Sequence, residues 1–302
     1  MTFLLALLPV IAVVALGFLL ASHDFPPAEG WRAIERLCYV VLFPCLIVRV
    51  LANAPLDSIP WRIAVALVAA QLVMAAVGHA ACYWPGLPRP AIGSIIQSNV
   101  RWNTFVALSL AGALHGQAGL ALTAVAAVAM IPTANVIAIL GFSRYGDAAV
   151  KRHPFLEVLQ NPLVIASVAG GALNATGVAL PAIADQVLGT LAEAALGLGL
   201  LAAGAGIDVG ALRRAGARTL VWSLLRLLLM PVFAVGFALA LGADRVALAV
   251  VAIAAATPTA TSGYVLARQL GGDAPFMANL IAAQTLLAVI TMPLIMWLTG
   301  IA

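Results

Sequence analysis

Charged side chains are scarce in this sequence. They make up 9% of the 302 residues, whereas a typical soluble domain carries roughly 25%. So few charges cannot cover a surface that faces water, and hydrophobic residues make up 64% of the chain. The composition argues against a water-soluble globule, a disordered chain and a nucleic-acid-binding protein. We therefore expect an integral membrane protein surrounded by the lipid bilayer, with no nucleic-acid partner.

Lysine, cysteine and catalytic patterns are scarce too. Lys151 is the one lysine among fifteen basic residues, and the arginines stand singly or in small groups rather than on one basic face. Cys38, Cys45 and Cys82 lie in or beside apolar segments without metal-ligand spacing, so we expect small buried side chains and no disulfide. The sequence has no nucleophile triad, phosphate loop or metal cluster. It therefore predicts no enzymatic activity, no cofactor and no metal.

Long apolar runs dominate what is present. A helix needs roughly 20 apolar residues to cross the hydrocarbon core. No basic residues precede the first apolar run, so we interpret it as a membrane helix rather than a cleaved signal peptide. We expect an all-α polytopic membrane protein with ten transmembrane helices at about 3–21, 37–53, 61–84, 92–114, 118–142, 159–178, 184–206, 217–241, 245–266 and 275–299.

The basic residues between these spans indicate an orientation. The odd-numbered loops and their edges hold ten arginine and lysine residues, whereas the even-numbered loops hold only Arg62 and Arg245. Loops rich in positive charge stay on the cytoplasmic side of the membrane. The sequence therefore predicts that the N-terminus and the C-terminus both lie outside.

The ten spans divide into two sets of five. Residues 1–145 hold the first set, residues 146–158 form a cytoplasmic linker, and residues 159–302 hold the second set. Because five is odd, the second set enters the membrane from the opposite side, which gives the inverted repeat common in secondary transporters. The fourth span of each half carries a polar run, at 97–104 and 256–264, the second with Pro258. A proline alone is often a plain kink, but matching polar runs favour two helix breaks near a substrate site.

Six short motifs follow one another along the chain. They are LPVIAVVALGF at 8–18, YVVLFPCL at 39–46, RWNTF at 101–105, IPTANV at 131–136, NPL at 161–163 and PTATSGYVLA at 258–267. In this order they resemble the bacterial branch of the auxin efflux carrier family, which lies within the bile acid and anion transporter superfamily. The resemblance covers nearly the whole chain.

This resemblance implies a fold and a mechanism. Helices 4 and 9 would be broken and would cross at midmembrane. Helices 1, 2, 6 and 7 (about 3–53 and 159–206) would form a scaffold, often dimeric, and helices 3–5 and 8–10 (about 61–142 and 217–299) an elevator-like transport domain. Family members carry organic anions such as auxin, malonate or malate, and a bacterial member would lie in the inner membrane.

One departure from the family concerns the fourth helix. Plant carriers have a proline at the helix-4 crossover, where this sequence reads ALSL at 107–110. Ser109 is a weaker helix breaker than proline. We therefore expect the fourth helix to bend there rather than to break fully.

Three arginines fall within the expected spans. A charge inside the bilayer is costly, so Arg101 and Arg226, both near mid-depth, are functional candidates. The planar guanidinium of Arg101 fits a carboxylate through two hydrogen bonds; the alternatives are a structural ion pair or a helix cap. Arg226 could contact substrate, replace a bound cation as in related folds, or form a structural pair. Arg49 lies near a helix end, and we expect its side chain to snorkel to water.

The acidic residues support an anionic substrate. Ten of the eleven fall in loops or at helix ends, and only Glu193 lies within a span, in the expected scaffold. A sodium–proton antiporter of comparable fold would need a carboxylate on the transport helices. Backbone carbonyls and hydroxyls could still bind sodium, so a sodium-coupled mechanism remains open.

The sequence thus predicts a sodium-independent carrier of small organic carboxylates that forms a homodimer through its scaffold helices. The alternatives are a sodium-coupled symporter of the bile-acid type and a non-transporting membrane receptor. For Asn99 and Asn135 the alternative role is a helix–helix hydrogen bond, and the threonines around Pro258 could instead satisfy carbonyls freed by the proline. The expected substrate-binding residues are Asn99, Arg101, Asn103, Thr104, Ser109, Asn135, Thr257, Pro258, Thr259 and Thr261, with Arg226 as a possible cation substitute.

Overall fold

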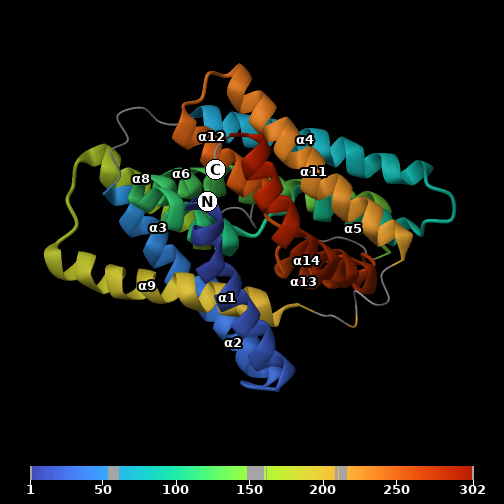
Figure 1. Ribbon diagram of the computed structural model, residues 1–302, viewed down its shortest axis with the longest axis horizontal. Helices are drawn as coiled ribbons and strands as arrows, with labels where there is room; N and C mark the ends of the chain where they lie inside the picture. The colour runs from blue at the N-terminus through green and yellow to red at the C-terminus, as the bar shows by residue number, and fades with distance from the viewer. Residues whose placement is uncertain are drawn as a thin grey trace.

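The computed structural model describes residues 2–53, 61–147, 160, 162–207, 210 and 216–300, and the elements in these ranges are helices (Figure 1). Residues 148–158 of the predicted linker, with Lys151, and Asn161 of the NPL motif lie outside the described residues. The first half contains α1 (Thr2–Ser22), α2 (Ala28–Leu37), η1 (Cys38–Leu42), α3 (Phe43–Ala52), α4 (Trp61–His79), η2 (Ala80–Tyr83), α5 (Arg89–Val100) and α6 (Thr104–Tyr145). The second half contains α8 (Pro162–Thr176), α9 (Ala182–Ala205), α11 (Ala217–Ala240), α12 (Arg245–Ala256), α13 (Ser262–Gln269) and α14 (Ala274–Leu298).

Several of these helices are long and apolar enough to cross a membrane. Within the described ranges there are five such segments: Trp61–Tyr83, Arg89–Tyr145, Ala182–Ala205, Ala217–Ala240 and Ala274–Leu298. Leu8–Ser22, Pro162–Thr176 and Arg245–Ala256 are apolar but shorter. The prediction of an all-helical membrane protein is confirmed, whereas the count of ten spans stays a prediction.

The longest of these segments is not one straight helix. As a continuous helix, its 57 residues would extend about 85 Å, nearly three times the thickness of the hydrocarbon core. It is interrupted at residues 101–103 and again at Gly116, whose φ of 56° and ψ of −140° divide α6 into 104–115 and 117–145. Glycine adopts a positive φ more readily than residues that have a Cβ atom. The chain reverses there, so that the Gly119 backbone lies against the Ala111 carbonyl, at the turn predicted between the fourth and fifth spans.

Buried apolar side chains form three clusters that connect the helices. The first cluster joins α4, α11, α12 and α14 to α6, and α4 and α11 lie side by side in it (Figure 1). The second joins η1, α3, α8 and α9 to the middle of α6. The third joins α5, α13, α14 and the C-terminal end of α6. Among these clusters, α6 is the helix that contributes to all three.

α1 packs closely along α9 (Figure 1). Two glycines allow this approach: a side chain at Gly17 would meet the Leu201 carbonyl, and one at Gly204 would meet the Val14 carbonyl. Because the obstacles are backbone atoms, neither position can accept a larger residue without separating the two helices. The pair therefore fixes α1 against α9.

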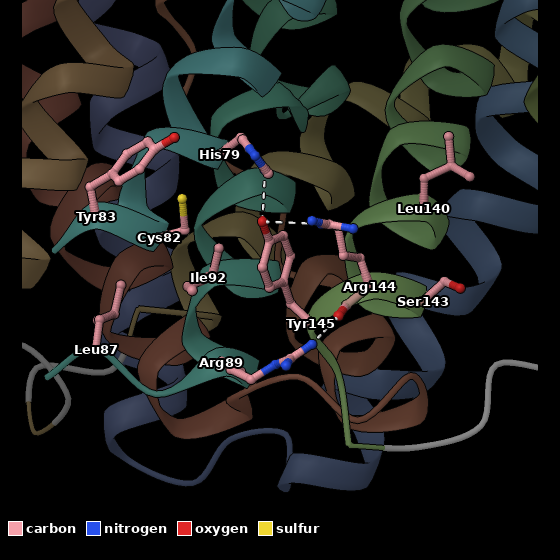
Figure 2. A pocket seen from close by; sticks show the side chains of 10 residues that line it. All are labelled: His79, Cys82, Tyr83, Leu87, Arg89, Ile92, Leu140, Ser143, Arg144 and Tyr145. Atoms are coloured by element: carbon pink, nitrogen blue, oxygen red, sulfur yellow. Dashed lines mark hydrogen bonds between the residues drawn. The ribbon is translucent and has the colours of Figure 1, made fainter. Parts of the chain in front are cut away.

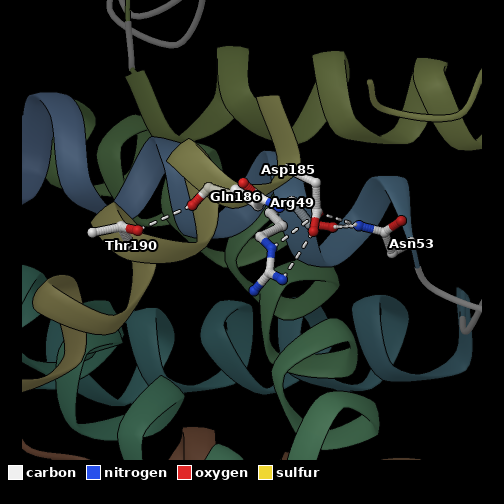
Figure 3. Close-up of polar contacts among 5 residues, drawn as sticks. All are labelled: Arg49, Asn53, Asp185, Gln186 and Thr190. Atoms are coloured by element: carbon white, nitrogen blue, oxygen red, sulfur yellow. Dashed lines mark hydrogen bonds and ion pairs between the residues drawn. The ribbon is translucent and has the colours of Figure 1, made fainter. Parts of the chain in front are cut away.

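An ion pair joins α3 to α9 near their ends (Figure 3). Arg49 donates from Nε and Nη2 to the two carboxylate oxygens of Asp185, at 3.0 and 3.1 Å, and Asn53 donates to the same carboxylate at 3.2 Å. The Arg49 side chain is 34% exposed, in keeping with the expected snorkelling, and the structure adds an ion-pair partner that the sequence did not indicate. Asp185 was counted as a loop or helix-end acid, and folding brings it to Arg49 across 136 residues of sequence.

The three cysteines differ in burial. Cys38 is buried and Cys45 is half-buried, in keeping with small side chains within apolar segments, and all three thiols are free. Cys82 is exposed, so the expectation of burial is wrong for this residue. It lies in η2, the short 3-10 turn that ends the α4 segment, where the chain leaves the apolar packing.

Candidate functional site

The first helix break lies at residues 101–103. α5 ends at Val100 and α6 begins at Thr104. Arg101 between them has an extended backbone, with φ −80° and ψ 142°. The ten residues from Ala91 to Val100 are all buried, so the break follows a helix enclosed by protein.

Asn103 determines where the chain becomes helical again. Its side-chain oxygen accepts hydrogen bonds from the backbone nitrogens of Phe105 and Val106, at 3.1 and 3.2 Å. This is the geometry of an N-terminal helix cap. The expected bend at 107–110 is therefore wrong: Ser109 is buried inside α6, and the break occurs before it. A capping asparagine, rather than a helix breaker, sets the position.

The second helix break lies at residues 257–261. α12 ends at Ala256 and α13 begins at Ser262. Thr257 has an extended backbone, with φ −62° and ψ 148°, and its hydroxyl donates to the Ala254 carbonyl at 2.8 Å. Pro258 follows and has no backbone N–H to continue the helix. Threonine and proline thus end α12 where the sequence predicted a break.

Hydrogen bonds connect the two breaks directly. The backbone nitrogen of Asn103 donates to the Thr257 hydroxyl at 3.3 Å. The Thr259 hydroxyl donates to the Ser98 carbonyl at 2.7 Å and lies 3.5 Å from the Arg101 carbonyl. More than 150 residues of sequence separate these partners. The two polar runs therefore form one polar cluster within an apolar protein.

Arg226 on α11 is the charge at the centre of this cluster. Its side chain is completely buried. The guanidinium donates from Nη1 to the Ala255 carbonyl at 2.7 Å and from Nη2 to the Arg101 carbonyl at 3.4 Å. Carbonyls at a helix C-terminus carry partial negative charge. Among the described residues Arg226 forms no ion pair with a carboxylate, so the carbonyls at the two breaks take that place.

Arg101 is half-buried and bridges three parts of the chain. Its Nη2 donates to Oδ1 of Asn135 on α6 at 2.8 Å, and its Nη1 donates to the hydroxyl of Ser262 at 3.3 Å. These two partners are both neutral oxygen atoms. The structure thus brings Arg101, Asn135 and the second break together, as a shared binding site requires.

Gln284 on α14 contributes to the cluster although no sequence motif indicated a role for it. Its Oε1 accepts a hydrogen bond from the backbone nitrogen of Thr259 at 3.0 Å. Its Nε2 donates to the Ser98 hydroxyl at 2.7 Å. Gln284 is fully buried. In the sequence, an amide within a long apolar run is the one signal that could have identified it.

Two further glutamines support the backbone around the first break. Gln71 on α4 donates to the Val100 carbonyl at 2.8 Å and to the Met130 carbonyl at 3.1 Å. Gln97 on α5 donates to the Gly263 carbonyl at 2.7 Å. Val100 is the last residue of α5, so its carbonyl has no intrahelical partner and Gln71 satisfies it. The glutamines therefore hold the breaks in place.

The second half of this cluster lies within a recognisable domain. Residues 148–296, about half of the chain, match the family model described as membrane transport protein. This part of the chain belongs to the membrane transport protein family. It is the family of the auxin efflux carriers, so the family drawn from the motifs is confirmed over these residues, whereas the bacterial branch and the superfamily stay predictions. No curated protein matches the chain.

The match divides the cluster between the two halves of the transporter. Arg226, the second break and Gln284 lie inside the matched residues, whereas Arg101, Asn103 and Asn135 lie before them. Hydrogen bonds join the two sets directly. The first half therefore completes the polar cluster whose other part lies in the family domain.

The other predicted site residues are placed less centrally. Thr104 is buried at the first position of α6. Asn99 is buried and donates to the Met74 carbonyl on α4 at 3.2 Å, which is the helix–helix bond considered as its alternative role. Ser109 is buried within α6, with no hydrogen-bond partner for its hydroxyl among the described residues. Asn99 therefore connects α5 to α4, and Ser109 lies inside α6 beyond the first break.

Thr261 connects the second break to a different helix. Its hydroxyl donates to the Glu35 carboxylate at 3.2 Å. Glu35 lies in the last turn of α2. Burial raises the pKa of the Glu35 carboxyl, and the hydrogen bond from Thr261 opposes that shift. The half-buried carboxylate of Glu35 therefore contacts the second break at Thr261. The sequence pattern did not indicate this contact.

Proposed function

We propose that the chain is a secondary transporter built as a 5+5 inverted repeat of ten transmembrane helices, with helices 4 and 9 broken and crossed. The parallel between the halves supports this: α5 and α12 each contain 12 residues, and each is followed by an extended, polar break. Each is also preceded by a long apolar helix, α4 or α11. In transporters with inverted repeats, broken helices of this kind form the substrate site near midmembrane.

The substrate in this proposal is a small organic carboxylate. The observation that carries it is the position of Arg101 between the two breaks, where its guanidinium donates to the side-chain oxygens of Asn135 and Ser262. A carboxylate can accept two parallel hydrogen bonds from a guanidinium. It would displace or share these hydrogen bonds. A neutral or cationic substrate could not form such a charge-assisted pair with Arg101.

The helices beyond the breaks add to this preference for anions. The N-terminal ends of α6 and α13 begin at Thr104 and Ser262, beside Arg101. A helix N-terminus carries partial positive charge and attracts anions. Asn103, Thr257, Pro258 and Thr259 would fix the shape of the site mainly through the backbone. Thr104 would line its edge.

Arg226 in this proposal takes the place of a bound cation. Its guanidinium donates to carbonyls at both breaks, the groups that would otherwise coordinate sodium. A fixed positive charge at that point removes the need for a metal ion. We therefore infer sodium-independent transport, with a sodium-coupled symporter as the alternative.

Movement would follow an elevator mechanism. The apolar cluster of η1, α3, α8 and α9 would belong to the scaffold, and the clusters around α4, α11, α12 and α14 to the moving domain. Binding of an anion would place a negative charge beside the Arg101 guanidinium. The loaded domain would then cross the bilayer at a lower cost than the empty one, because paired charges are less expensive in lipid than separate ones.

A homodimer through the scaffold helices is part of the same proposal, in a bacterial inner membrane with both termini outside. On α9, Glu193 is exposed and Gly197 has open space beside it. A carboxylate exposed to lipid is costly, so a second copy of the chain that covers this face would stabilise it. The mass of the detergent-solubilised protein tests this proposal. A wild-type protein that has the mass of a monomer, with the same mass in Glu193→Leu, would contradict the dimer.

The decisive experiment is uptake of labelled malonate into liposomes that contain the purified protein. It is run with and without a sodium gradient, and with unlabelled mono- and dicarboxylates as competitors. We expect competable, sodium-independent uptake. Arg101→Ala should weaken apparent substrate affinity by roughly tenfold to hundredfold, the loss expected for charge-assisted hydrogen bonds.

Two controls make this result specific. Arg268→Ala removes an exposed arginine near the end of α13 and should leave uptake unchanged. A thermal unfolding measurement must show that Arg101→Ala still folds. Unchanged uptake in Arg101→Ala would reject the site, and uptake that requires sodium would favour the bile-acid type of symporter. Absence of competition by every carboxylate would reject the substrate class.

A further inference from the structure

A second polar site lies apart from the helix breaks, at the ends of α4, α5 and α6. A cavity of about 690 Å³ opens there between η2, the start of α5 and the last turn of α6. Its polar wall contains His79, Arg89, Ser143, Arg144 and Tyr145 (Figure 2). The proposed transport mechanism assigns no role to these residues.

The polar side chains of this cavity are held in a fixed arrangement. The hydroxyl of Tyr145 lies 2.8 Å from Nδ1 of His79 and accepts a hydrogen bond from Nε of Arg144 at 3.4 Å. The Arg144 guanidinium also lies over the Tyr145 ring, 5.6 Å from its centroid. Arg89 donates from Nη2 to the Arg144 carbonyl at 2.8 Å. Figure 2 shows the Arg144 guanidinium beside the Tyr145 hydroxyl and the Arg89 guanidinium near the backbone end of the same tyrosine.

The charge that the described residues give this cavity is positive. Arg89 and Arg144 are both exposed, and none of the residues lining the cavity is acidic. A guanidinium has five N–H donors, and the hydrogen bonds among the described residues use one donor of Arg89 and one of Arg144. The other donors of the two exposed guanidinium groups can bind an anion with several oxygens in the cavity.

The edge of the cavity is apolar. Tyr83 is 83% exposed and Leu140 is 60% exposed. Both lie at the ends of apolar segments long enough to cross a membrane, where tyrosine is typical of the interface between lipid and water. A ligand that fits both features combines an anionic head with apolar chains. A soluble carboxylate would use only the polar wall.

We propose that this cavity binds the phosphate headgroup of an anionic phospholipid. Basic pockets between membrane helices on the cytoplasmic side are suited to such headgroups. The phosphate would contact Arg89 and Arg144, and the Ser143 hydroxyl could donate to a second oxygen. The acyl chains would extend along Leu140 and Tyr83. The proposed orientation assigns the cavity to the cytoplasmic leaflet, but binding itself does not depend on the transport proposal.

The test measures lipid binding to the purified full-length protein in a non-ionic detergent. Short-chain phosphatidylglycerol is titrated against phosphatidylcholine and against glycerol 3-phosphate, with the unfolding temperature and native mass spectrometry as readouts. We expect phosphatidylglycerol to bind and stabilise the wild type. Arg144→Gln should weaken this binding by roughly tenfold or more, because a charge-assisted hydrogen bond to phosphate is lost.

Matched variants separate the site from general charge effects. Arg144→Lys keeps the charge and Arg268→Gln removes an exposed arginine outside the cavity, so both should retain binding. Ser143→Glu places a negative charge in the cavity at an exposed position and should abolish binding even if Arg144→Gln fails to fold. Binding that survives both Arg144→Gln and Ser143→Glu would overturn the proposal. Equal affinity for glycerol 3-phosphate would overturn the lipid assignment and indicate a soluble phosphate ester instead.

Discussion

Replacing Arg226 by alanine tests the role of the buried charge most directly. The guanidinium donates to the Ala255 carbonyl at 2.7 Å and lies 3.4 Å from the Arg101 carbonyl. Arg226→Ala removes both contacts and leaves space between the two breaks. Arg226→Lys keeps a positive charge within reach of the carbonyls. The pair of variants therefore separates the charge from the packing of the side chain.

The expected destabilisation follows from these contacts. The short bond to Ala255 contributes about 1.5–3 kcal/mol as a charge-assisted hydrogen bond, whereas the longer contact lies beyond the usual N–H···O range and counts for little. Removing two buried methylene groups costs about 1.6 kcal/mol more. Relief from burying a charge acts in the opposite direction, so we expect a net loss of about 2–4 kcal/mol. At 2–4 °C per kcal/mol, this lowers the unfolding temperature by roughly 5–15 °C.

Sodium provides the second part of this test. If Arg226 replaces a cation, the vacated carbonyls of Arg226→Ala can coordinate sodium. For a Kd of about 10 mM, 100 mM sodium would restore about 1.4 kcal/mol. The unfolding temperature and malonate uptake of Arg226→Ala should therefore rise with sodium but not with choline, and Arg226→Lys should not respond. An Arg226→Ala protein that is as stable as the wild type, or that is insensitive to sodium, would refute the reasoning.

Two further predictions concern groups that the sequence did not identify. Gln284→Leu removes the hydrogen bonds of Gln284 to the Thr259 nitrogen and the Ser98 hydroxyl, so it should lower the free energy of unfolding by about 2–4 kcal/mol. It should lower the unfolding temperature more than the control Gln269→Leu, which alters an exposed glutamine. Equal effects of the two substitutions would contradict a supporting role for Gln284. Burial raises the pKa of Glu35, so the folded state binds a proton that the unfolded state releases between the two pKa values. Stability should therefore rise as pH falls from 7 towards 5 by more in the wild type than in Glu35→Gln, and parallel unfolding curves in the two proteins would remove this assignment.

The sequence predicted the class, the helices and the two breaks because each depends on local composition. Apolar runs of sufficient length form helices that lipid can surround. Pro258 and the polar residues at 97–104 interrupt those runs whatever tertiary structure surrounds them. Arg101 and Arg226 were identified for the same reason, since a charge within an apolar run stands out in one dimension.

The exact position of the first break was not predictable from the resemblance. Ser109 marks the place where related carriers have proline, but the helix is continuous there. Asn103, six residues before Ser109, caps the helix that starts at Thr104, because its side-chain oxygen can accept from two backbone nitrogens at once. Many asparagines could cap in this way, and which one does so depends on the packing of α12 against α6.

Only the tertiary structure decided how these elements act together. The partners of Gln284, Arg226 and Arg49 lie far away in sequence, and each hydrogen bond requires two packed helices to bring donor and acceptor within about 3 Å. The cavity beside Arg144 likewise forms from the ends of three helices. Hydropathy and motifs are properties of the chain, and they determined that this protein is a membrane transporter with two polar breaks. Contacts between distant residues are properties of packing, and they determined which side chains complete the site.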